Sequence, residues 1–486
     1  MLKFYVNVFI IAFFPFFLNA QTSELQPDST KYHHTDAIFQ SLKKVCAADN
    51  NSNDLKLEFM FYHKNDLFPT LQGAWTNGTT IYIRENCYDI CKNSINPDGA
   101  LALIIAHEMV HCIKKHTGQT IICNTDTANN ITQEKLTITQ THEEEADILG
   151  YLYARIAGYA PSTDGKQIIE ILYKKYNLPN KSPTHPPLQK RIALAMQDYA
   201  AAEEAYYQYE HGLIAYILSD YLTAVQNFHH IANTYKITAP EVLNNEAVGI
   251  LAALCISKES ATYQQFLTNL QLDSFLKNAK QHYTPTESTR GNTEVYKELY
   301  KFLRPKYNSY SDSLRYKYLL RYADSLLQKA SNMSPQNKTI IQNKKVLDSM
   351  KQPIYTIKND TNIIGVKPKK APNLINIDEK YLNNLYDIND CTPILLREDF
   401  KYKIINNEII KLKTNNITIL LTDTRYTKNI LTDIKIGDNY TMIEDKYGKT
   451  DIKIVTNVFT FLHYANSKVI FKVNNESKNI ISIVLY

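Results

Sequence analysis

The stretch AHEMVHCIKKH, residues 106–116, constrains this chain more than any other part of its sequence. On an α-helix, His107 and His111 are four residues apart, so both imidazoles project from one face and can bind one cation at about 2.0–2.1 Å. Glu108 follows the first histidine and lies close enough to that face to accept a proton from water. The pattern therefore predicts a helix that carries two metal ligands and a general base.

A second stretch, THEEEADILGYLYARIAGY, contains a candidate for the third protein ligand that a zinc site needs. If Glu143 binds the metal, Asp147 lies one turn further along the same helix face. There it could accept a hydrogen bond from the free ring N–H of a ligand histidine. Taken alone, the run EEEAD is better explained as the solvated acidic start of a helix. Beside the two histidines, the metal site is the favoured interpretation.

Three ordered motifs carry a family resemblance: HEMVHCIKKH, then EEEADILGYLYARIAGYAP, then THPPLQKRIALA. Together they resemble the M48 family of gluzincin metallopeptidases, in its soluble exported bacterial branch, and the resemblance covers about residues 30–199. It implies a zincin-like metallopeptidase domain with one zinc ion per chain. The resemblance implies that His107, His111 and Glu143 bind the zinc ion. It also implies that Glu108 is the general base and that Asp147 is the hydrogen-bond partner of a ligand histidine.

The resemblance also assigns residues outside the ligand set. His116 falls on an extra histidine of the family, for which we expect a structural role. The THPPLQKR block matches the segment where the family places a histidine and an arginine over the site, here His185 and Arg191. Arg191 would stabilise the oxyanion that forms when water attacks a peptide carbonyl. His185 has two alternatives, since it could donate to that oxyanion or bind the zinc in a closed state. The chain departs from the family in having Cys112 inside the metal helix.

The chain of 486 residues is too long for one ordinary core, so we expect two to four domains in an α+β fold. Most of the chain has helical periodicity, and the last part has the alternating pattern of strands. The expected division is a signal peptide (1–20), a metallopeptidase domain (30–200), helical repeats (201–350), a linker (351–375) and a β-rich domain (376–486).

The helical repeats are predicted from the spacing of small and aromatic residues. Gly212, Ala224 and Phe228 have the spacing of the small, small and aromatic positions of a tetratricopeptide repeat, and Ala323, Ala330 and Pro335 match in part. A helix hairpin needs small residues where its helices cross and a large one beside them. The alternative is a generic helical bundle.

Strand patterns occur in two places. The run TTIYIRE, residues 79–85, follows the turn Asn77-Gly78, and an extended substrate could pair with a free edge of this strand, if it is not an ordinary core strand. Near the C-terminus, FKYKIINNEIIKLK and KVIFKVNNESKNIISIVLY alternate around Asn-rich turns, as in β-hairpins. Between them, residues 435–450 predict a turn and a short helix that ends at Gly448.

The N-terminus predicts export. Lys3, an apolar run over residues 4–18 and the small Ala20 form a secretory signal peptide, with cleavage near Ala20. A retained anchor is the alternative, but Asn7 and Pro15 interrupt a run that is shorter than the roughly 20 apolar residues of a span. We therefore expect a periplasmic or secreted protein without a transmembrane helix in the mature chain.

If the protein is exported, its seven cysteines could form disulfides, because an oxidising compartment permits them. A disulfide among those in the first 125 residues is one interpretation. Zinc binding by the Cys87 and Cys91 pair is the less favoured one, because no second pair accompanies it. The cysteines concerned are Cys46, Cys87, Cys91, Cys112 and Cys123.

These features favour a zinc-dependent endopeptidase of the cell envelope that acts on exported, misfolded polypeptides. The helical repeats would recruit substrates or an envelope assembly or quality-control partner. A formal net charge of +5, spread without a basic block, gives no reason to expect nucleic acid. Two alternatives remain: a repeat-based binding protein or chaperone with a latched, largely inactive zinc site, and a non-proteolytic zinc hydrolase.

Overall fold

A computed structural model describes a large part of the chain. The predicted signal peptide, His185, Cys123 and residues 353–375 of the predicted linker lie outside the described residues. The described residues are 29–46, 54–60, 73–116, 133–161, 169–171, 188–258, 261–272, 294–305, 311–352, 392–394, 397–405, 409–413, 418–422, 431, 434–455 and 459–486.

A small sheet lies near the N-terminus, with the strand order β1-β3-β2. Strand β1 (Lys56–Met60) runs parallel to β3 (Thr80–Arg84), and β2 (Ala74–Asn77) runs antiparallel to it. Gly78 has a φ of 66°, in the left-handed region that a tight turn requires. The strand predicted over residues 79–85 is present as β3, although Glu85 already begins the next helix.

The expectation that a substrate pairs with an edge of this strand is wrong, because β3 is the central strand. Both of its edges are taken by β1 and β2. Burial alternates along it, with Ile81 and Ile83 in the core. It is the core strand that the sequence left as an alternative, and a free edge has to be sought on an outer strand.

Three helices pack against this sheet, α1 (Ser29–Val45), α2 (Glu85–Lys92) and α3 (Pro97–Ile113), and α4 (Gln133–Ile156) packs on α3. Helix α3 starts at a strong capping signal, since Pro97 takes the first helical position and the Asn96 side chain accepts a hydrogen bond from the Gly99 amide at 3.1 Å. Its residues from Gly99 to Ile113 are all buried. Helix α3 is thus a core element, flanked by α1, α2 and α4.

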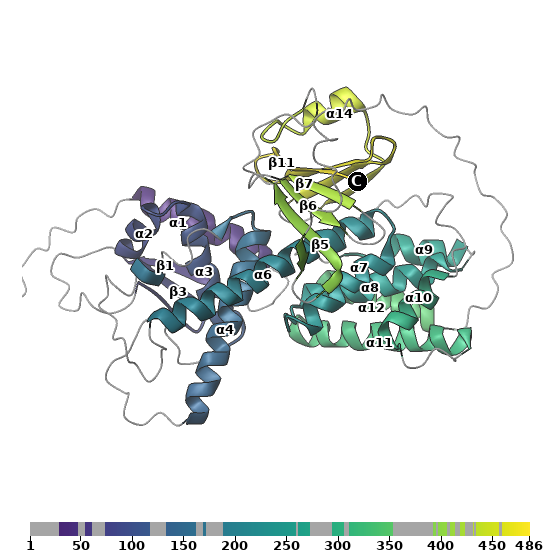
Figure 1. Ribbon diagram of the computed structural model, residues 1–486, viewed down its shortest axis with the longest axis horizontal. Coiled ribbons are helices and arrows are strands. Elements are labelled where there is room, and N and C mark those ends of the chain that lie inside the picture. The colour runs from purple at the N-terminus through teal and green to yellow at the C-terminus, as the bar shows by residue number, and fades with distance from the viewer. Residues whose placement is uncertain are drawn as a thin grey trace, which may run out of the picture.

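Helix α6 (Leu188–Ile217) joins this part of the molecule to the next. Figure 1 shows it running from the N-terminal helices toward the group labelled α7 to α12. It is continuous across the predicted boundary at residues 200 and 201. The helices that follow are α7 (Tyr221–Asn233), α8 (Pro240–Ile256), α9 (Ala261–Asn269), α10 (Glu294–Leu303), α11 (Asp312–Met333) and α12 (Lys338–Lys351).

Close packing between α6, α7 and α8 depends on two glycines. A Cβ on Gly212 would lie 2.9 Å from the Phe228 ring, and a Cβ on Gly249 would lie 2.6 Å from a methyl group of Val225. Small residues therefore do lie where these helices cross, with Phe228 filling the gap, as the spacing of the sequence suggests.

The C-terminal part is one antiparallel sheet with the strand order β4-β5-β6-β7-β11-β10-β9-β8. Both predicted hairpins are present, as β5 with β6 and β10 with β11. Helix α14 (Thr441–Tyr447) ends at Gly448, as expected. The strands are β4 (Thr392–Ile394), β5 (Arg397–Ile405), β6 (Ile409–Lys413), β7 (Thr418–Thr422), β8 (Ile452–Val455), β9 (Phe459–Tyr464), β10 (Val469–Asn474) and β11 (Ile480–Leu485).

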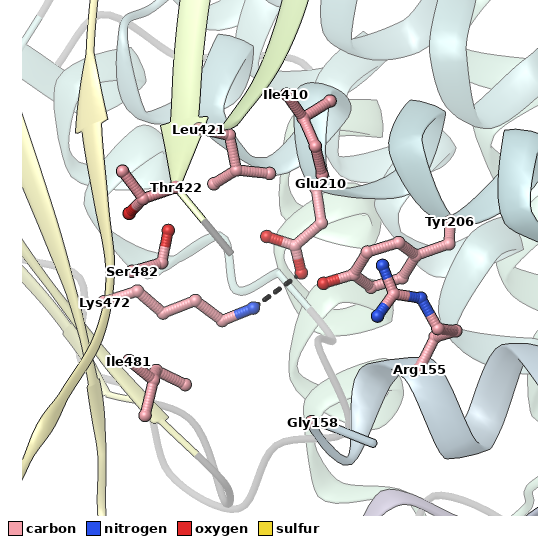
Figure 2. A pocket seen from close by; sticks show the side chains of 10 residues that line it. All are labelled: Arg155, Gly158, Tyr206, Glu210, Ile410, Leu421, Thr422, Lys472, Ile481 and Ser482. Atoms are coloured by element: carbon pink, nitrogen blue, oxygen red, sulfur yellow. Dashed lines mark hydrogen bonds and ion pairs between the residues drawn. The ribbon is translucent and has the colours of Figure 1, made fainter. Parts of the chain in front are cut away.

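The sheet packs directly on α6. Phe400 and Tyr402 of β5 contact His211 and Tyr207, with ring centroids 4.9 and 5.3 Å apart. Beside them, Lys472 of β10 enters a small cavity of about 40 Å³ against α6, which Figure 2 shows. The C-terminal sheet and the helical region thus share one hydrophobic core.

The observed architecture is a mixed α+β fold, in which a mostly helical region precedes the C-terminal antiparallel sheet. Among the described residues, no helix is long and apolar enough to cross a bilayer.

Candidate metal centre

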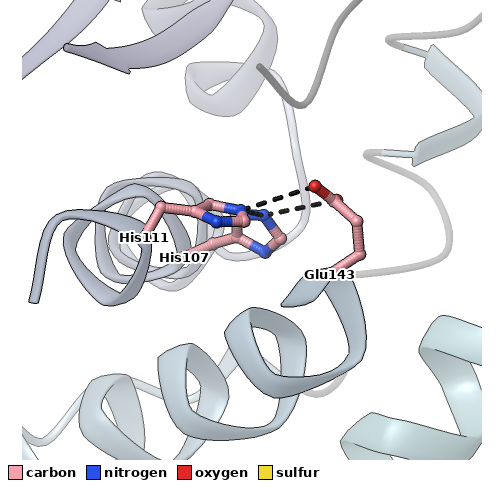
Figure 3. A group of neighbouring side chains, drawn as sticks. All are labelled: His107, His111 and Glu143. Atoms are coloured by element: carbon pink, nitrogen blue, oxygen red, sulfur yellow. Dashed lines mark hydrogen bonds and ion pairs between the residues drawn. The ribbon is translucent and has the colours of Figure 1, made fainter. Parts of the chain in front are cut away.

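Two histidines and one glutamate converge from two helices. His107 and His111 lie on the same side of α3, and Glu143 reaches them from α4 (Figure 3). The two Nε2 atoms are 2.9 Å apart, and the Glu143 carboxylate oxygens lie 3.7 Å from that of His107 and 3.5 Å from that of His111. Both histidines are buried, and the Glu143 side chain is 12% exposed. This group could hold a metal ion.

Helix geometry and one glycine create this convergence. The four-residue spacing puts His107 and His111 on one face of α3. Gly150, two turns beyond Glu143 on α4, lies directly on the α3 backbone, since a Cβ there would be 2.8 Å from the His107 nitrogen. Any side chain at Gly150 would push α4 away and withdraw Glu143 from the histidines.

Asp147 orients His107 as the sequence predicts. Its Oδ1 lies 2.9 Å from His107 Nδ1, so a hydrogen on Nδ1 leaves the lone pair of Nε2 for a cation. Arg191 contacts both carboxylate oxygens of Asp147, with Nη2 3.0 Å from Oδ1 and Nη1 against Oδ2. Burial opposes the charge on Asp147, but Arg191 and His107 outweigh it and hold the pKa of this carboxyl well below its usual range.

His116 orients the second histidine, which the sequence did not suggest. Lys115 has a φ of 56°, and this left-handed residue turns the chain after α3 so that His116 returns to His111. The two Nδ1 atoms are 3.0 Å apart, and His116 Nε2 is 3.3 Å from Glu145 Oε2. If His111 binds through Nε2, its Nδ1–H donates to His116, and His116 donates in turn to Glu145.

Glu145 is held as an anion at the end of this chain of contacts. Its hydrogen bond from His116, with the nearby Lys114 at 3.1 Å, lowers the pKa of the carboxyl to about 2. The His142 ring stacks on the His116 ring, with centroids 4.0 Å apart. The acidic run EEEAD therefore supplies a candidate ligand, Glu143, and two carboxylates, Glu145 and Asp147, that each orient one histidine.

Glu108 is completely buried, at 0% exposure, and neither of its carboxylate oxygens has a hydrogen-bond partner among the described residues. The same holds for both oxygens of Glu143. Burial raises the pKa of Glu108 to about 8. Buried carboxylates without donors are costly, and a cation is the kind of group that would offset that cost.

The electrostatics of the two histidines also fit a cation. Burial opposes protonation of His107, but the hydrogen bond and charge of Asp147, helped by Glu143 and Glu108, raise its pKa. Burial and the neighbouring His107 lower the pKa of His111 to about 2, so His111 is neutral. The environment attracts positive charge and offers neutral imidazole and carboxylate donors, which suits zinc.

The remaining predicted residues lie in different places. Arg191 lies beside the centre and contacts Asp147, whereas the position of His185 is outside the described residues. Cys112 does not join the metal group, since its Sγ lies 2.5 Å from Thr76 Oγ1 on β2 and burial raises its thiol pKa to about 11. Cys87 is a buried thiol.

Comparison with known proteins adds no family assignment. The sequence matches no protein-family model and no curated protein.

Proposed function

We propose that this protein is a zinc-dependent endopeptidase, and that His107, His111 and Glu143 hold its metal. The observation that carries the proposal is the position of Glu108, a fully buried carboxylate without a hydrogen-bond partner among the described residues, one residue from a ligand histidine. A site that only stored a metal would not need a second buried carboxylate there. When bound, zinc would supply Lewis acidity, which polarises a carbonyl and makes water more acidic.

The other side chains would transfer the proton, orient the ligand histidines and stabilise the oxyanion. Glu108 accepts the proton of the attacking water and delivers it to the leaving amine. Asp147 keeps a hydrogen on His107 Nδ1, and His116 serves His111 in the same way. Arg191 holds Asp147 through its two terminal nitrogens, and its remaining N–H groups are the donors available for the oxyanion of the reaction.

Strand β2 is the proposed place for an extended substrate. Among the described strands it pairs only with β3. The main-chain N–H and C=O groups of its other edge could therefore pair with an extended peptide. Thr76 of β2 contacts Cys112, which directly follows His111 on α3, so this strand runs beside the metal centre. Pairing through the main chain selects for an extended conformation more than for sequence, which suits exported and misfolded polypeptides of the cell envelope.

The test compares casein cleavage by the wild type and Glu108→Gln at equal zinc content. Removing a general base should lower the rate by about 10²–10⁴-fold. Glu144→Gln is the matched control, because Glu144 is an exposed acid on α4 and should keep wild-type activity. A zinc-loaded wild type that cleaves neither casein nor short peptides would contradict the proposal and favour the binding-protein alternative.

A further inference from the structure

A second candidate site lies far along the chain from the metal centre. A groove of about 370 Å³ opens between α7, α8 and α11, within the range of ligand sites. Leu243 and Leu326, both buried, and the half-buried Met333 give it an apolar lining. Such a surface can take the aliphatic stem of a long side chain.

One buried carboxylate lines this groove. Glu246 of α8 is 0% exposed, yet its Oε2 has no hydrogen-bond partner among the described residues. Its other oxygen, Oε1, accepts a hydrogen bond from the Tyr322 hydroxyl at 3.0 Å and lies 2.7 Å from His229 Nδ1. Two neighbours therefore fix the carboxylate through Oε1 and leave Oε2 to accept from a further donor.

The rim of the groove is polar. Asn233, Thr238 and Asn332 are exposed there, and amide and hydroxyl groups can bond to the main chain of an extended segment. Lys329, also exposed on the rim, would repel a segment that carries several basic residues. The groove thus combines an anionic floor, apolar walls and a rim that disfavours polybasic ligands.

We propose that this groove docks a polypeptide segment by taking one lysine or arginine side chain, whose stem lies on Leu243 and Leu326 and whose cationic end bonds to Glu246 Oε2. The docking role rests on the proposed function, in which the helical region holds clients for the metal centre. The inference adds a binding site and a side-chain preference that the metal centre does not specify.

The experiment measures binding without hydrolysis, in the full chain carrying Glu108→Gln. The probe is a short fluorescent peptide of glycine, serine and asparagine with one central lysine. A second peptide carries norleucine at that position, which has the same stem without the ammonium group. The lysine peptide should bind at least about tenfold more tightly, because hydrogen bonds to charged groups discriminate by that much. Equal affinities would overturn the proposal.

Three variants locate the effect. Glu246→Gln should abolish the preference for lysine, whereas Asp324→Asn should keep it, because Asp324 lies on the same helix α11 as Tyr322 but pairs with Lys351. Asn332→Trp, a change at an exposed rim residue, should block both peptides and provides a test that does not alter the buried carboxylate. A lysine preference that survives in a folded Glu246→Gln protein, or unchanged binding by Asn332→Trp, would show that the peptide binds elsewhere.

A small amine provides the remaining arm. Butylamine should compete with the lysine peptide only weakly, because it lacks the main chain that the rim amides would contact. Equal affinity for butylamine would make the groove a site for small amines and refute polypeptide docking. Since no arm requires hydrolysis, a failure of this proposal is distinguishable from a failure of the peptidase proposal.

Discussion

The metal centre and the contact between α6 and the C-terminal sheet both contain buried charges, but they satisfy them differently. At the contact, Lys472 of β10 is 4% exposed and its Nζ lies 2.7 Å from Glu210 Oε1 (Figure 2). The same Nζ lies 3.9 Å from the centroid of the Phe459 ring, a favourable cation–π contact. At the metal centre, Glu108 and Glu143 have no hydrogen-bond partner among the described residues.

The difference separates a buried ion pair within the chain from buried carboxylates whose oxygens have no hydrogen-bond partner among the described residues. A buried ion pair whose partners both belong to the chain fixes how two elements pack. At the metal centre the cation of the chain, Arg191, pairs with Asp147 and comes no closer than 4.0 Å to Glu143, so the group of two histidines and Glu143 could hold a metal ion from outside. Helix α6 takes part in both regions, because Arg191 near its start contacts Asp147 and Glu210 further along contacts Lys472.

The largest effect on stability is expected from breaking the internal pair. Lys472→Met should lower the free energy of unfolding by about 3–5 kcal/mol, because Glu210 is left as a buried charge without compensation. Urea unfolding followed by circular dichroism measures this. Lys453→Met is the matched control, since Lys453 is a half-exposed lysine of the same sheet that lies 3.6 Å from Glu444, and should cost less than about 1 kcal/mol. Equal effects of the two variants would show that the buried pair does not fix the sheet.

The next effect concerns zinc binding at the metal centre. Asp147→Ala should weaken zinc binding by about 10–100-fold, because His107 loses the acceptor that fixes its hydrogen on Nδ1. Competition with a fluorescent chelator gives the affinity. Glu144→Ala, an exposed acid on the same helix, should bind zinc as the wild type does. Wild-type affinity in Asp147→Ala would show that this carboxylate serves only Arg191.

The smallest effect is expected at His116, which would act on zinc only through His111. His116→Ala should weaken zinc binding by about tenfold, at the lower end of the range for such supporting residues. His116→Asn should recover part of the loss, because the amide oxygen can take the place of Nδ1 as the acceptor for His111. If alanine and asparagine at this position give the same affinity, His116 has the purely structural role that the sequence suggests.

How far the sequence predicts this molecule depends on how local each feature is. His107 and His111 are related by helix periodicity, and both C-terminal hairpins by alternation around a turn, so these features can be predicted. The return of His116 depends on a left-handed Lys115, for which the sequence carries no signal, because lysine rarely adopts that conformation.

Long-range features were beyond prediction for a different reason. Strand β3 is central because β1 pairs with it in parallel, although β2 lies between the two in the sequence. No single strand's sequence encodes this order. The pair of Lys472 and Glu210 joins residues 262 positions apart. Residues around 200 are good helix formers, so α6 continues where a change of domain was expected.

The central claim is that the group of His107, His111 and Glu143 binds a metal ion. The metal content of the purified protein tests this claim most directly. The mature protein, dialysed and analysed by plasma mass spectrometry, should carry about one zinc ion per chain, because two imidazoles and a carboxylate form a typical zinc donor set. His111→Ala should reduce this to near zero in a folded protein. A wild type without zinc, or a His111→Ala variant with unchanged zinc, would contradict the account.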